Sequence, residues 1–391
     1  MPTPADALLT ATAHLPTPSA ILDETALWAN ADDLVERAAG VPVRVATKSV
    51  RVREIVERTL ARDGFAGVMS YSLRESLWLV EHGIDDVLLA YPTVDPDALR
   101  ALASDDAARA AITLMVDSVE HLDVVEAALG PGHPSIRLCL DVDASLRIGP
   151  PGLAAHLGVR RSPVHTARQA RTVARAIEAR AGFELVGLMF YDAQIAGLPD
   201  TSPAVRLVKK ASNAELHRRR RAVVDAVRQH ADLTLVNAGG TGSLETTGAD
   251  PVVTELTAGS GLFCPTLFDG YDAFEARAAA FFALSVTRRP SRSVATLHAG
   301  GYVASGPASD TRLPTPVWPT GLDLLGTEGA GEVQTPVTGR NARHLSVGDR
   351  VLLRYAKAGE MCERFDIVAL VREDGTVEQL PTYRGERKAF G

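Results

Sequence analysis

The sequence predicts an α/β protein with an N-terminal (β/α)8 barrel of the TIM type, residues 17–271, and a second, β-rich domain, residues 272–391. Two observations predict this fold. Eight short apolar runs alternate with amphipathic segments between Pro42 and Leu256, and helix-like segments are no longer found after Tyr271. A chain of 391 residues with 46% apolar residues is also too long for one average core, so that two domains are expected.

The eight runs are continuous rather than alternating, which is typical of strands that are covered on both faces. They are Val43–Thr47, Ala66–Ser70, Val87–Ala90, Ile112–Val116, Ile136–Val142, Leu185–Phe190, Leu233–Asn237 and Val253–Leu256. The intervening segments, such as Val52–Arg62 and "LRESLWLVEHG", carry apolar residues at three- and four-residue spacing, as amphipathic helices do. Eight strand-then-helix units predict a closed parallel barrel, with an open doubly wound sheet as the alternative.

The residues after Tyr271 have a different pattern. The segments "AAFFALSVTRRP", "RSVATLHAGG", "GDRVLLRYA" and "RFDIVALVRED" resemble strands, and Gly/Pro-rich turns rather than helices join them. The early segment "PSAILDET" is expected to add a strand to this β-rich domain, so that residues 1–25 pack with it.

The composition excludes several classes of protein. A formal net charge of −7 and a pI near 5.8 argue against a nucleic-acid binder, and the run "HRRRR" at residues 217–221 reads as the polar face of a helix. No apolar stretch approaches the roughly 20 residues that a membrane-spanning helix needs. Three scattered cysteines do not form a disulfide framework and the N-terminus lacks a signal-peptide pattern, so a cytoplasmic location is expected.

One lysine and two glycine-rich turns lie where a barrel carries its active site. Lys48 stands at the end of the first run, "NAGGTGS" (237–243) follows the seventh and "TAGSG" (257–261) follows the eighth. Catalytic groups of such barrels lie at the C-terminal ends of the strands, and phosphate sites are commonly built by the loops after strands seven and eight. Glycine lets backbone N–H groups approach an anion, and the hydroxyls of Thr241, Ser243 and Ser260 can add donors.

A lysine and a phosphate site in one cavity indicate a cofactor that carries both an aldehyde and a phosphate, which is pyridoxal 5′-phosphate. The alternative for Lys48 is a solvated strand end, and the alternative for each turn is an ordinary glycine turn.

The motifs "VRVATKSVR", "LRIG", "GLMFYDAQ", "NAGGTGS" and "ELTAGSG" resemble, in order and spacing, those of the fold-type III, alanine-racemase-like pyridoxal-phosphate enzymes. The β-rich domain resembles that of the D-threonine aldolase and D-serine dehydratase branch. The resemblance implies that Lys48 binds the cofactor aldehyde, Arg147 lies near its phenolic oxygen and Tyr191 faces its ring. It also implies a homodimer with shared active sites and a phosphate site formed by Gly240, Thr241, Gly242, Gly259 and Ser260. The charge and hydropathy described above already argue against a nucleic-acid or membrane partner.

Local departures select the branch. Racemases and the related decarboxylases typically continue from the lysine as Lys-Ala-Asn, whereas Ser49 follows Lys48 here.

The aldolase and dehydratase branch typically binds a divalent metal (Zn, Mn or Mg) through a His-X-Cys or His-X-Asp pair. In "AKAGEMCERF" Cys362 matches the second ligand, but Glu360 stands in place of the histidine. The alternative is a buried cysteine beside a surface glutamate. His298 in "LHAGG" is a candidate base, metal ligand or packed histidine.

The resemblance therefore implies a pyridoxal-phosphate-dependent lyase that acts on D-β-hydroxy amino acids by aldol or retro-aldol cleavage of the Cα–Cβ bond, with Lys48, His298 and Tyr191 as catalytic residues. A dehydratase (deaminase) of D-serine or D-threonine is the first alternative. An amino-acid racemase and a carrier of pyridoxal phosphate without turnover follow.

Overall fold

The computed structural model of the protein describes residues 3–149 and 155–391. Contacts within the chain divide it into two compact units. The barrel unit comprises Leu34–Lys48, Thr59–Gly259 and the last two residues; the β-sheet unit comprises the residues up to Asp33, Ser49–Arg58 and Ser260–Ala389. The sequence suggests a domain boundary between residues 271 and 272. That boundary stays a prediction.

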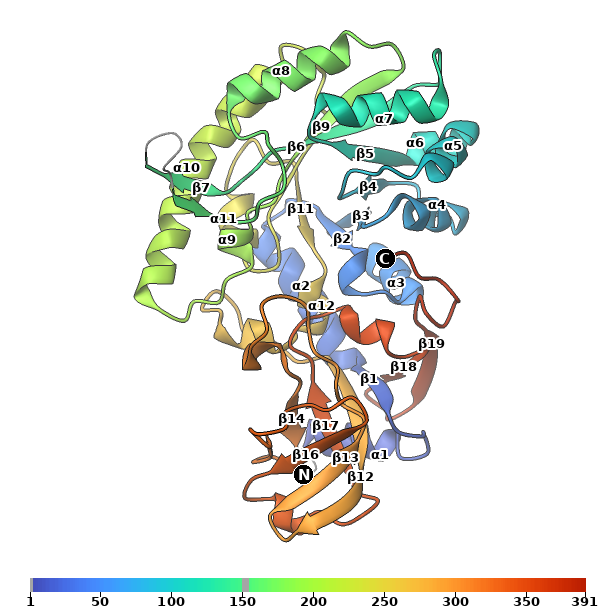
Figure 1. Ribbon diagram of the computed structural model, residues 1–391, viewed down its shortest axis with the longest axis vertical. Helices are drawn as coiled ribbons and strands as arrows, with labels where there is room; N and C mark the ends of the chain where they lie inside the picture. Colours follow the sequence, from blue (N-terminus) through green and yellow to red (C-terminus); the bar gives the residue numbers. More distant parts are fainter. Residues whose placement is uncertain (1–2, 150–154) are drawn as a thin grey trace. The chain divides into compact units, whose positions relative to one another are not determined.

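The barrel unit is built on a closed parallel barrel of eight strands, which confirms the predicted fold (Figure 1). The order around the barrel is β10, β11, β2, β3, β4, β5, β6 and β9. Each strand overlaps one of the eight apolar runs: β2 (Val43–Ala46), β3 (Phe65–Ser70), β4 (Val87–Leu89), β5 (Ile112–Val116), β6 (Ile136–Asp141), β9 (Phe183–Phe190), β10 (Leu235–Ala238) and β11 (Glu255–Ala258).

Amphipathic helices connect the strands and lie outside them in Figure 1. Their starts are marked by N-caps: Ser72 accepts a hydrogen bond from the N–H of Glu75, Asp95 precedes a proline at the first helical position, and Thr166 forms a capping box with Gln169. These helices are α4 (Leu73–Glu81), α5 (Pro96–Ser104), α6 (Asp106–Ala111), α7 (Val119–Leu129), α8 (Ala167–Glu178) and α10 (Pro203–Val227). Helices α2 (Glu24–Ala38) and α3 (Arg53–Leu60) each contribute residues to both units.

The run "HRRRR" lies on α10, as expected of a helix, but it is not uniformly solvated. Arg220 is 1% exposed and its guanidinium pairs with Asp250 at 2.5 Å. A charge this deeply buried needs such a partner, because an isolated buried charge is costly.

The strand register brings the motif-bearing turns to one end of the barrel. Ala238 at the end of β10 pairs with Phe190 at the end of β9, and Ala258 at the end of β11 pairs with Val45 near the end of β2. Because parallel strands end at the same edge, the segments that follow them emerge side by side.

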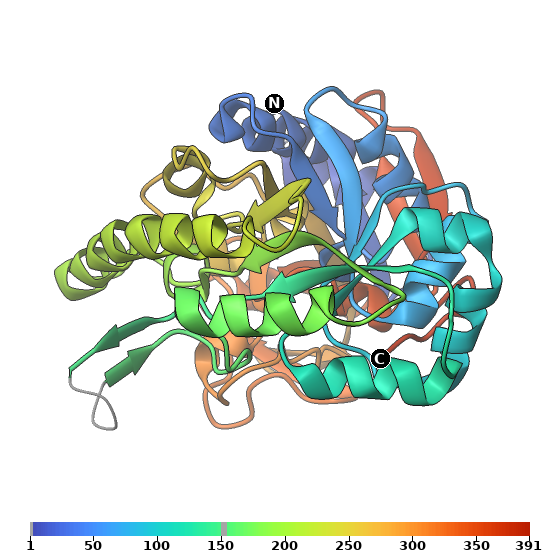
Figure 2. The same cartoon turned by 90° about the horizontal axis from the view of Figure 1, so that it is seen from above.

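A two-stranded hairpin, β7 (Leu146–Ile148) with β8 (Ala155–Leu157), follows strand β6. Figure 2 shows this teal-green hairpin extending away from the barrel strands. Arg147 lies on it, opposite His156.

The β-sheet unit contains a nine-stranded sheet, as the predicted β-rich domain requires. The early segment forms β1 (Ser19–Asp23), which pairs antiparallel with β12 and parallel with β18. The other strands are β12 (Ala280–Ser291), β13 (Val294–His298), β14 (Thr315–Trp318), β15 (Asp323–Leu324), β16 (Gln334–Thr338), β17 (Arg350–Arg354), β18 (Ile367–Val371) and β19 (Val377–Pro381).

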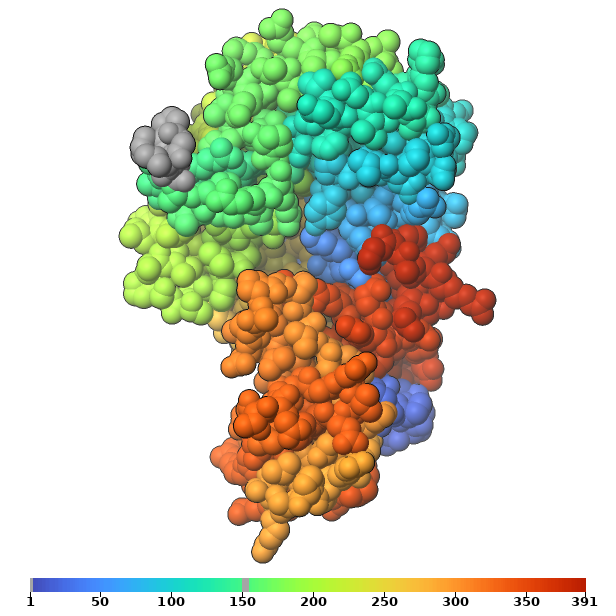
Figure 3. All heavy atoms as spheres, viewed as in Figure 1, coloured from blue at the N-terminus to red at the C-terminus, as the bar shows by residue number. Residues whose placement is uncertain are grey.

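The N-terminal helix α1 (Pro4–Ala11) packs on this sheet. Leu8 joins a buried cluster with Ile21 and Leu352, and the Arg350 guanidinium donates a 2.7 Å hydrogen bond to the carbonyl of Thr12. Figure 3 shows the blue N-terminal residues beside orange and red C-terminal ones. Among the described residues, no helix is both long and apolar enough to span a membrane.

Candidate active site

Lys48 lies in a short 3-10 turn, Thr47–Ser49, that directly follows strand β2. The Thr47 hydroxyl donates a 3.1 Å hydrogen bond to the carbonyl of Met69 on the neighbouring strand β3, which fixes the start of the turn. The Lys48 ammonium donates to the hydroxyl of Tyr91, with Nζ and Oη 2.6 Å apart. The structure therefore places the predicted lysine at the C-terminal end of its strand, beside a tyrosine that follows strand β4.

A buried ionic network within the barrel unit links strand β2 to its neighbours. Arg44 is 3% exposed, and its guanidinium donates two hydrogen bonds to the carboxylate of Glu255 on β11, at 2.9 and 2.7 Å, and two to Asp86, at 2.9 and 3.0 Å. Asn237 on β10 donates to the same Glu255. Bidentate pairs of this kind fix geometry as well as charge, so they hold the lysine strand in register with its neighbours.

Arg161 connects Tyr91 to Tyr191. Its guanidinium carbon lies 5.6 Å from the ring centre of Tyr91 and 5.0 Å from that of Tyr191, within cation–π range of both. Burial alone would raise the pKa of Tyr91, but the charge and hydrogen bond of Lys48, together with the charge of Arg161, outweigh burial and lower it. Tyr91, Arg161 and Tyr191 thus form a continuous series of cation–aromatic contacts, and Lys48 joins it through the Tyr91 hydroxyl.

Asp192, the residue after Tyr191, is hydrogen-bonded to the end of the first glycine turn and to the helix that follows it. It is fully buried and accepts hydrogen bonds from the hydroxyls of Thr247, at 2.7 Å, and Ser243, at 3.2 Å. Burial raises the pKa of Asp192, while Arg220 and these hydroxyls lower it by a smaller amount. Ser243, which the sequence suggests as a phosphate donor, is therefore engaged in holding the turn.

The first glycine turn, residues 239–243, packs closely on its neighbours. A side-chain carbon on Gly240 would lie 2.8 Å from the methyl carbon of Ala196 in helix α9 (Ala193–Ala196). The Thr241 carbonyl accepts a 2.6 Å hydrogen bond from Arg37, whose guanidinium also pairs with Glu245 in helix α11 (Leu244–Gly248). Only glycine fits position 240, so that the backbone itself forms this surface.

The second glycine turn meets the lysine strand. A side-chain carbon on Gly259 would overlap the carbonyl oxygen of Ala46, two residues before Lys48. Gly259 follows β11, and Ser260 begins the short helix α12 (Ser260–Phe263). The register of β11 with β2 thus brings the predicted phosphate turn and the predicted cofactor lysine together within the barrel unit.

Arg147 lies on the β7–β8 hairpin, where its guanidinium pairs with Asp143 at 2.5 Å. Burial raises the pKa of Asp143, but the hydrogen bonds from Ser145 and the pairing with Arg147 outweigh burial and lower it. The guanidinium that the structure places against the Tyr91 and Tyr191 rings belongs to Arg161, and the role of Arg147 at the cofactor stays a prediction.

Asp141, the last residue of β6, is a further acidic group at this end of the barrel. It is 7% exposed, and burial followed by the charge of Asp117 raises its pKa to about 7, with Arg161 acting in the opposite direction. Asp141 also influences Tyr91 electrostatically. A carboxyl group with such a pKa can hold or release a proton near neutral pH.

Sequence reasoning missed Tyr91, Arg161, Asp141 and Asp192. Tyr91 and Asp141 could have been found, since each lies at or just after the end of a predicted strand, where barrels place functional groups. Arg161 lies in a loop between β8 and α8, and no spacing in the sequence relates it to Tyr91 and Tyr191.

The remaining predicted residues lie in the β-sheet unit. His298 ends strand β13, is exposed and pairs in register with Gln334. Glu360 begins a 3-10 turn, Glu360–Glu363, and its Oε2 accepts a 2.9 Å hydrogen bond from the Ser305 N–H. Cys362 in the same turn has no exposed surface, and burial raises its pKa to about 12, so the thiol stays protonated.

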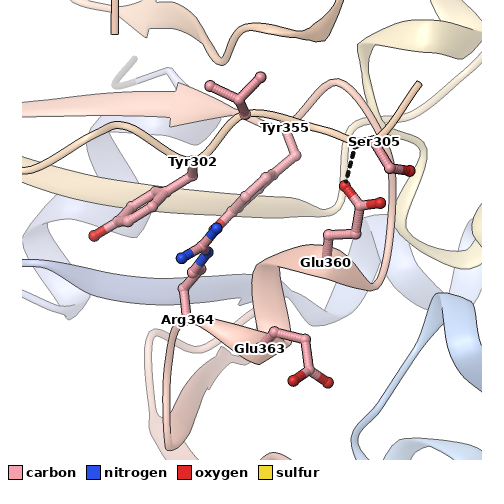
Figure 4. A pocket seen from close by; sticks show the side chains of 7 residues that line it. Tyr302, Ser305, Tyr355, Glu360, Glu363 and Arg364 are labelled. Atoms are coloured by element: carbon pink, nitrogen blue, oxygen red, sulfur yellow. Dashed lines mark hydrogen bonds between the residues drawn. The ribbon is translucent and has the colours of Figure 1, made fainter. Parts of the chain in front are cut away.

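These donors do not fit a metal centre. Cys362 is fully enclosed, and in the absence of a metal burial keeps its thiol protonated. In the part of the chain that the structure describes, no three His, Cys, Asp or Glu side chains converge as metal ligands. The Glu360 carboxylate is engaged by the Ser305 N–H (Figure 4), and the Cys362 thiol has no exposed surface.

The residues of the barrel unit do fit pyridoxal phosphate. Lys48 supplies an amine at a strand end, the Tyr191 and Tyr91 rings lie beside Arg161, and the turns at Gly240 and Gly259 leave no space for a side chain. Close backbone approach of this kind suits a bound phosphate.

Comparisons with known proteins identify the family and the fold. One curated relative, a D-threonine aldolase from an Arthrobacter species, is 28% identical over 301 residues, which cover 74% of this chain and 72% of that protein. The solved structure of D-threonine aldolase from Filomicrobium marinum superposes with a TM-score of 0.78 at 23% identity, covering 95% of this chain and 96% of that one.

D-threo-3-hydroxyaspartate dehydratase from a Delftia species superposes with a TM-score of 0.75 at 18% identity, covering 94% and 97% of the two chains. At these identities the two structures show a shared fold. The family model described as "Alanine racemase, N-terminal domain" matches residues 22–266, more than half of the chain. The chain therefore belongs to the alanine racemase N-terminal domain family, the fold-type III group whose cofactor is pyridoxal phosphate.

Proposed function

We propose that the protein is a pyridoxal-phosphate-dependent lyase that cleaves the Cα–Cβ bond of D-β-hydroxy amino acids. The observation that carries the proposal is the close contact of Gly259 with the Ala46 carbonyl, because it joins the second glycine turn to the strand that presents Lys48. The D-threonine aldolase relative and the shared fold support the reaction class.

Each proposed cofactor contact has a local structural reason. Lys48 would bind the aldehyde, Arg161 and Tyr191 would lie along the ring, and the backbone at residues 240–242, Gly259 and Ser260 would hold the phosphate. When bound, pyridoxal phosphate withdraws electrons from the bonds at the substrate Cα. The geometry around the ring selects which bond breaks.

The Lys48–Tyr91 pair supplies proton transfer at Cα. With Nζ and Oη 2.6 Å apart, one group can pass a proton to the other, and the lowered pKa of Tyr91 makes its hydroxyl a better proton donor. In cleavage, a base removes the β-hydroxyl proton, the Cα–Cβ bond breaks, an aldehyde leaves, and Lys48 or Tyr91 returns a proton to Cα to give glycine. His298 is the side chain proposed as the base; no step is assigned to a metal.

A D-β-hydroxy amino acid dehydratase is the second candidate. The Lys48–Tyr91 pair favours it specifically, since dehydration needs removal of the α-proton and departure of the β-hydroxyl. The fold shared with D-threo-3-hydroxyaspartate dehydratase is compatible with either reaction.

Product analysis after incubation with D-threonine separates the two. Cleavage yields glycine and acetaldehyde, whereas dehydration yields 2-oxobutanoate and ammonia. If D-threonine, D-serine and D-3-hydroxyaspartate leave the cofactor absorbance unchanged and yield none of these products, the lyase proposal fails; interconversion of D- and L-alanine would then indicate a racemase.

We further propose a cytoplasmic homodimer. The three cysteines are free and buried, which suits a reducing compartment, and His298 is exposed in one chain, as a base shared with a partner subunit would be. Analytical ultracentrifugation of the holoenzyme tests the dimer; a monomer with full turnover would contradict it.

A further inference from the structure

The carboxylate of Asp192 lies inside the barrel unit, and no step of the proposed reaction uses it. Asp192 follows Tyr191 and precedes the short helix α9, in which the N–H groups of Ile195 and Ala196 donate to its carbonyl at 2.8 and 2.9 Å. The residue has no exposed surface. Because a buried charge is costly unless it is paired and hydrogen-bonded, the groups around this carboxylate indicate why the chain keeps it.

Two hydroxyls donate to the Asp192 carboxylate. The Thr247 hydroxyl lies 2.7 Å from Oδ2 and the Ser243 hydroxyl lies 3.2 Å from Oδ1. Ser243 is the last residue of the first glycine turn, and Thr247 lies in helix α11, where its N–H donates to the Ser243 carbonyl at 2.8 Å. One carboxylate therefore fixes both the end of the turn and the helix that follows it.

Arg220 of helix α10 offsets part of the charge of Asp192. Its guanidinium is enclosed, pairs with Asp250 at 2.5 Å and lies 5.5 Å from the ring centre of Phe190 at the end of β9. Burial raises the pKa of Asp192, and the charge of Arg220 is the largest effect that lowers it. The chain thus spends a buried cation on this region, although neither group is near the surface.

The Asp192 carboxylate determines how the Ser243 hydroxyl is oriented. A hydroxyl has one proton to donate, and an ionised carboxylate can only accept. Ser243 donates to Asp192, with the Gly240 carbonyl at 3.5 Å as the more distant acceptor, and its Oγ accepts the Gly240 N–H at 3.2 Å. The Ser243 N–H donates to the Gly240 carbonyl at 2.9 Å, so that the two ends of the turn are closed on each other.

The closed turn contains a buried donor without an acceptor. Gly242 is buried, and within residues 3–149 and 155–391 no acceptor receives its N–H. Buried backbone N–H groups that lack a partner are rare in folded proteins. Successive backbone N–H groups in a turn form concavities that bind anions, so this donor suits a phosphate oxygen.

We propose that Asp192 is a positioning residue for the cofactor phosphate, and that it makes the chain select pyridoxal phosphate over unphosphorylated pyridoxal. Its carboxylate orients Ser243, Ser243 closes the turn on Gly240, and the closed turn keeps the Gly242 N–H available to the phosphate. The inference rests on the cofactor assigned in the proposed function. It adds a residue that contacts neither the cofactor nor the substrate.

The test is equilibrium dialysis of the full chain, freed of cofactor, against pyridoxal phosphate and separately against pyridoxal. Asp192→Asn replaces the charge at nearly constant volume, and we expect it to weaken pyridoxal phosphate binding about tenfold or more, the effect of losing a charge-assisted hydrogen bond. Binding of pyridoxal should change less than about twofold, because pyridoxal carries no phosphate for the turn to hold.

Matched variants separate the hydroxyl network from packing. Thr247→Val removes the hydroxyl and should weaken pyridoxal phosphate binding severalfold, whereas Thr247→Ser keeps the hydroxyl and should retain the affinity. Ser212→Ala is the control, since Ser212 is a buried serine of α10 whose hydroxyl has no hydrogen-bond partner among the described residues. It should change neither affinity.

Thermal melts show which variants are folded. A folded Asp192→Asn variant that binds pyridoxal phosphate as the wild type does would overturn the inference, and so would an equal loss of affinity for pyridoxal phosphate and pyridoxal. If Asp192→Asn does not fold, the comparison of Thr247→Val with Thr247→Ser decides by the same two affinities.

Failure of the proposed function gives a different result. A wild-type chain that binds pyridoxal phosphate and pyridoxal equally would contradict the phosphate site itself. A wild-type chain that prefers pyridoxal phosphate but yields no product from D-threonine would contradict only the lyase reaction.

Discussion

The amine of Lys48 lies 2.6 Å from the hydroxyl of Tyr91, and this contact joins the ends of two strands, β2 and β4. It provides the lysine with a proton partner that lies two residues after the end of β4. Tyr91→Phe removes the partner and keeps the ring. We expect kcat with the preferred D-β-hydroxy amino acid to fall by about a hundredfold, the lower end of the range for general acid–base groups.

The phosphate turns do not involve the Tyr91 hydroxyl, so the affinity of Tyr91→Phe for pyridoxal phosphate should change little. Tyr271→Phe, in the β-sheet unit, is the matched control and should retain kcat. If Tyr91→Phe retains full kcat over the whole pH range, Tyr91 is not the proton partner of Lys48.

Lys48 is expected to carry the cofactor. Borohydride reduction of the holoenzyme, followed by peptide mapping, should locate the pyridoxyl group on Lys48, and Lys48→Ala should give no reduced adduct. Lys209 pairs with Asp200 at 2.7 Å and Lys357 donates to the Ser305 hydroxyl at 3.3 Å, so both side chains are engaged elsewhere. A pyridoxyl group on Lys209, Lys210 or Lys357 would show the assignment to be wrong.

Gly259→Ala tests the junction of the second glycine turn with the lysine strand. The added methyl group would overlap the Ala46 carbonyl oxygen, and a backbone atom cannot turn aside as a side chain can. We expect pyridoxal phosphate to bind at least about tenfold more weakly, which corresponds to about 1.4 kcal/mol.

Gly326→Ala is the control for this substitution, because a methyl group there would meet no atom within 4 Å. Equilibrium dialysis measures the cofactor affinity and thermal melts report any general loss of stability. Unchanged cofactor affinity in Gly259→Ala would separate the phosphate site from this turn.

The barrel could be predicted because its signal is repeated: each of the eight apolar runs overlaps a strand, and Lys48 and the glycine turns follow strand ends. The contacts of Arg161 could not be predicted in this way. It lies in a loop, and its position against Tyr91 and Tyr191 depends on how that loop folds toward the residues that follow β4 and β9. For Cys362 the sequence left two readings open, a metal ligand or a buried cysteine, since the pattern of a turn does not tell which side chains face the interior; the structure shows it buried.

Asp141 should make the stability of the protein depend on pH. Its pKa is about 7 in the folded state and near 3.8 when the carboxyl is unperturbed, so between these values the folded state binds more protons than the unfolded state. Stability from this group is therefore full below about pH 4, decreases as pH rises toward 7, and is constant above that.

The Asp141→Asn side chain cannot ionise, so its free energy of unfolding should lack this pH dependence. The part that is lost is at most about 4 kcal/mol, for a shift of about three pKa units. Urea unfolding at pH 5 and pH 8 measures it, with Asp63→Asn as the control at an exposed position. A wild-type protein whose free energy of unfolding falls no more steeply than that of Asp141→Asn between these pH values would rule out a raised pKa for Asp141.

Exhaustive chelation tests whether the β-hydroxyl chemistry needs a metal. Because Cys362 is enclosed as a protonated thiol and the Glu360 carboxylate accepts the Ser305 N–H, we expect D-threonine turnover and cofactor absorbance both to survive chelation. His298→Ala should instead lower kcat by about a hundredfold or more, the usual contribution of a general base, while His344→Ala, an exposed histidine of the same unit, should not. Loss of turnover on chelation, restored by Mn²⁺ and absent in Cys362→Ala, would assign the β-oxygen to a metal and remove His298 from that role.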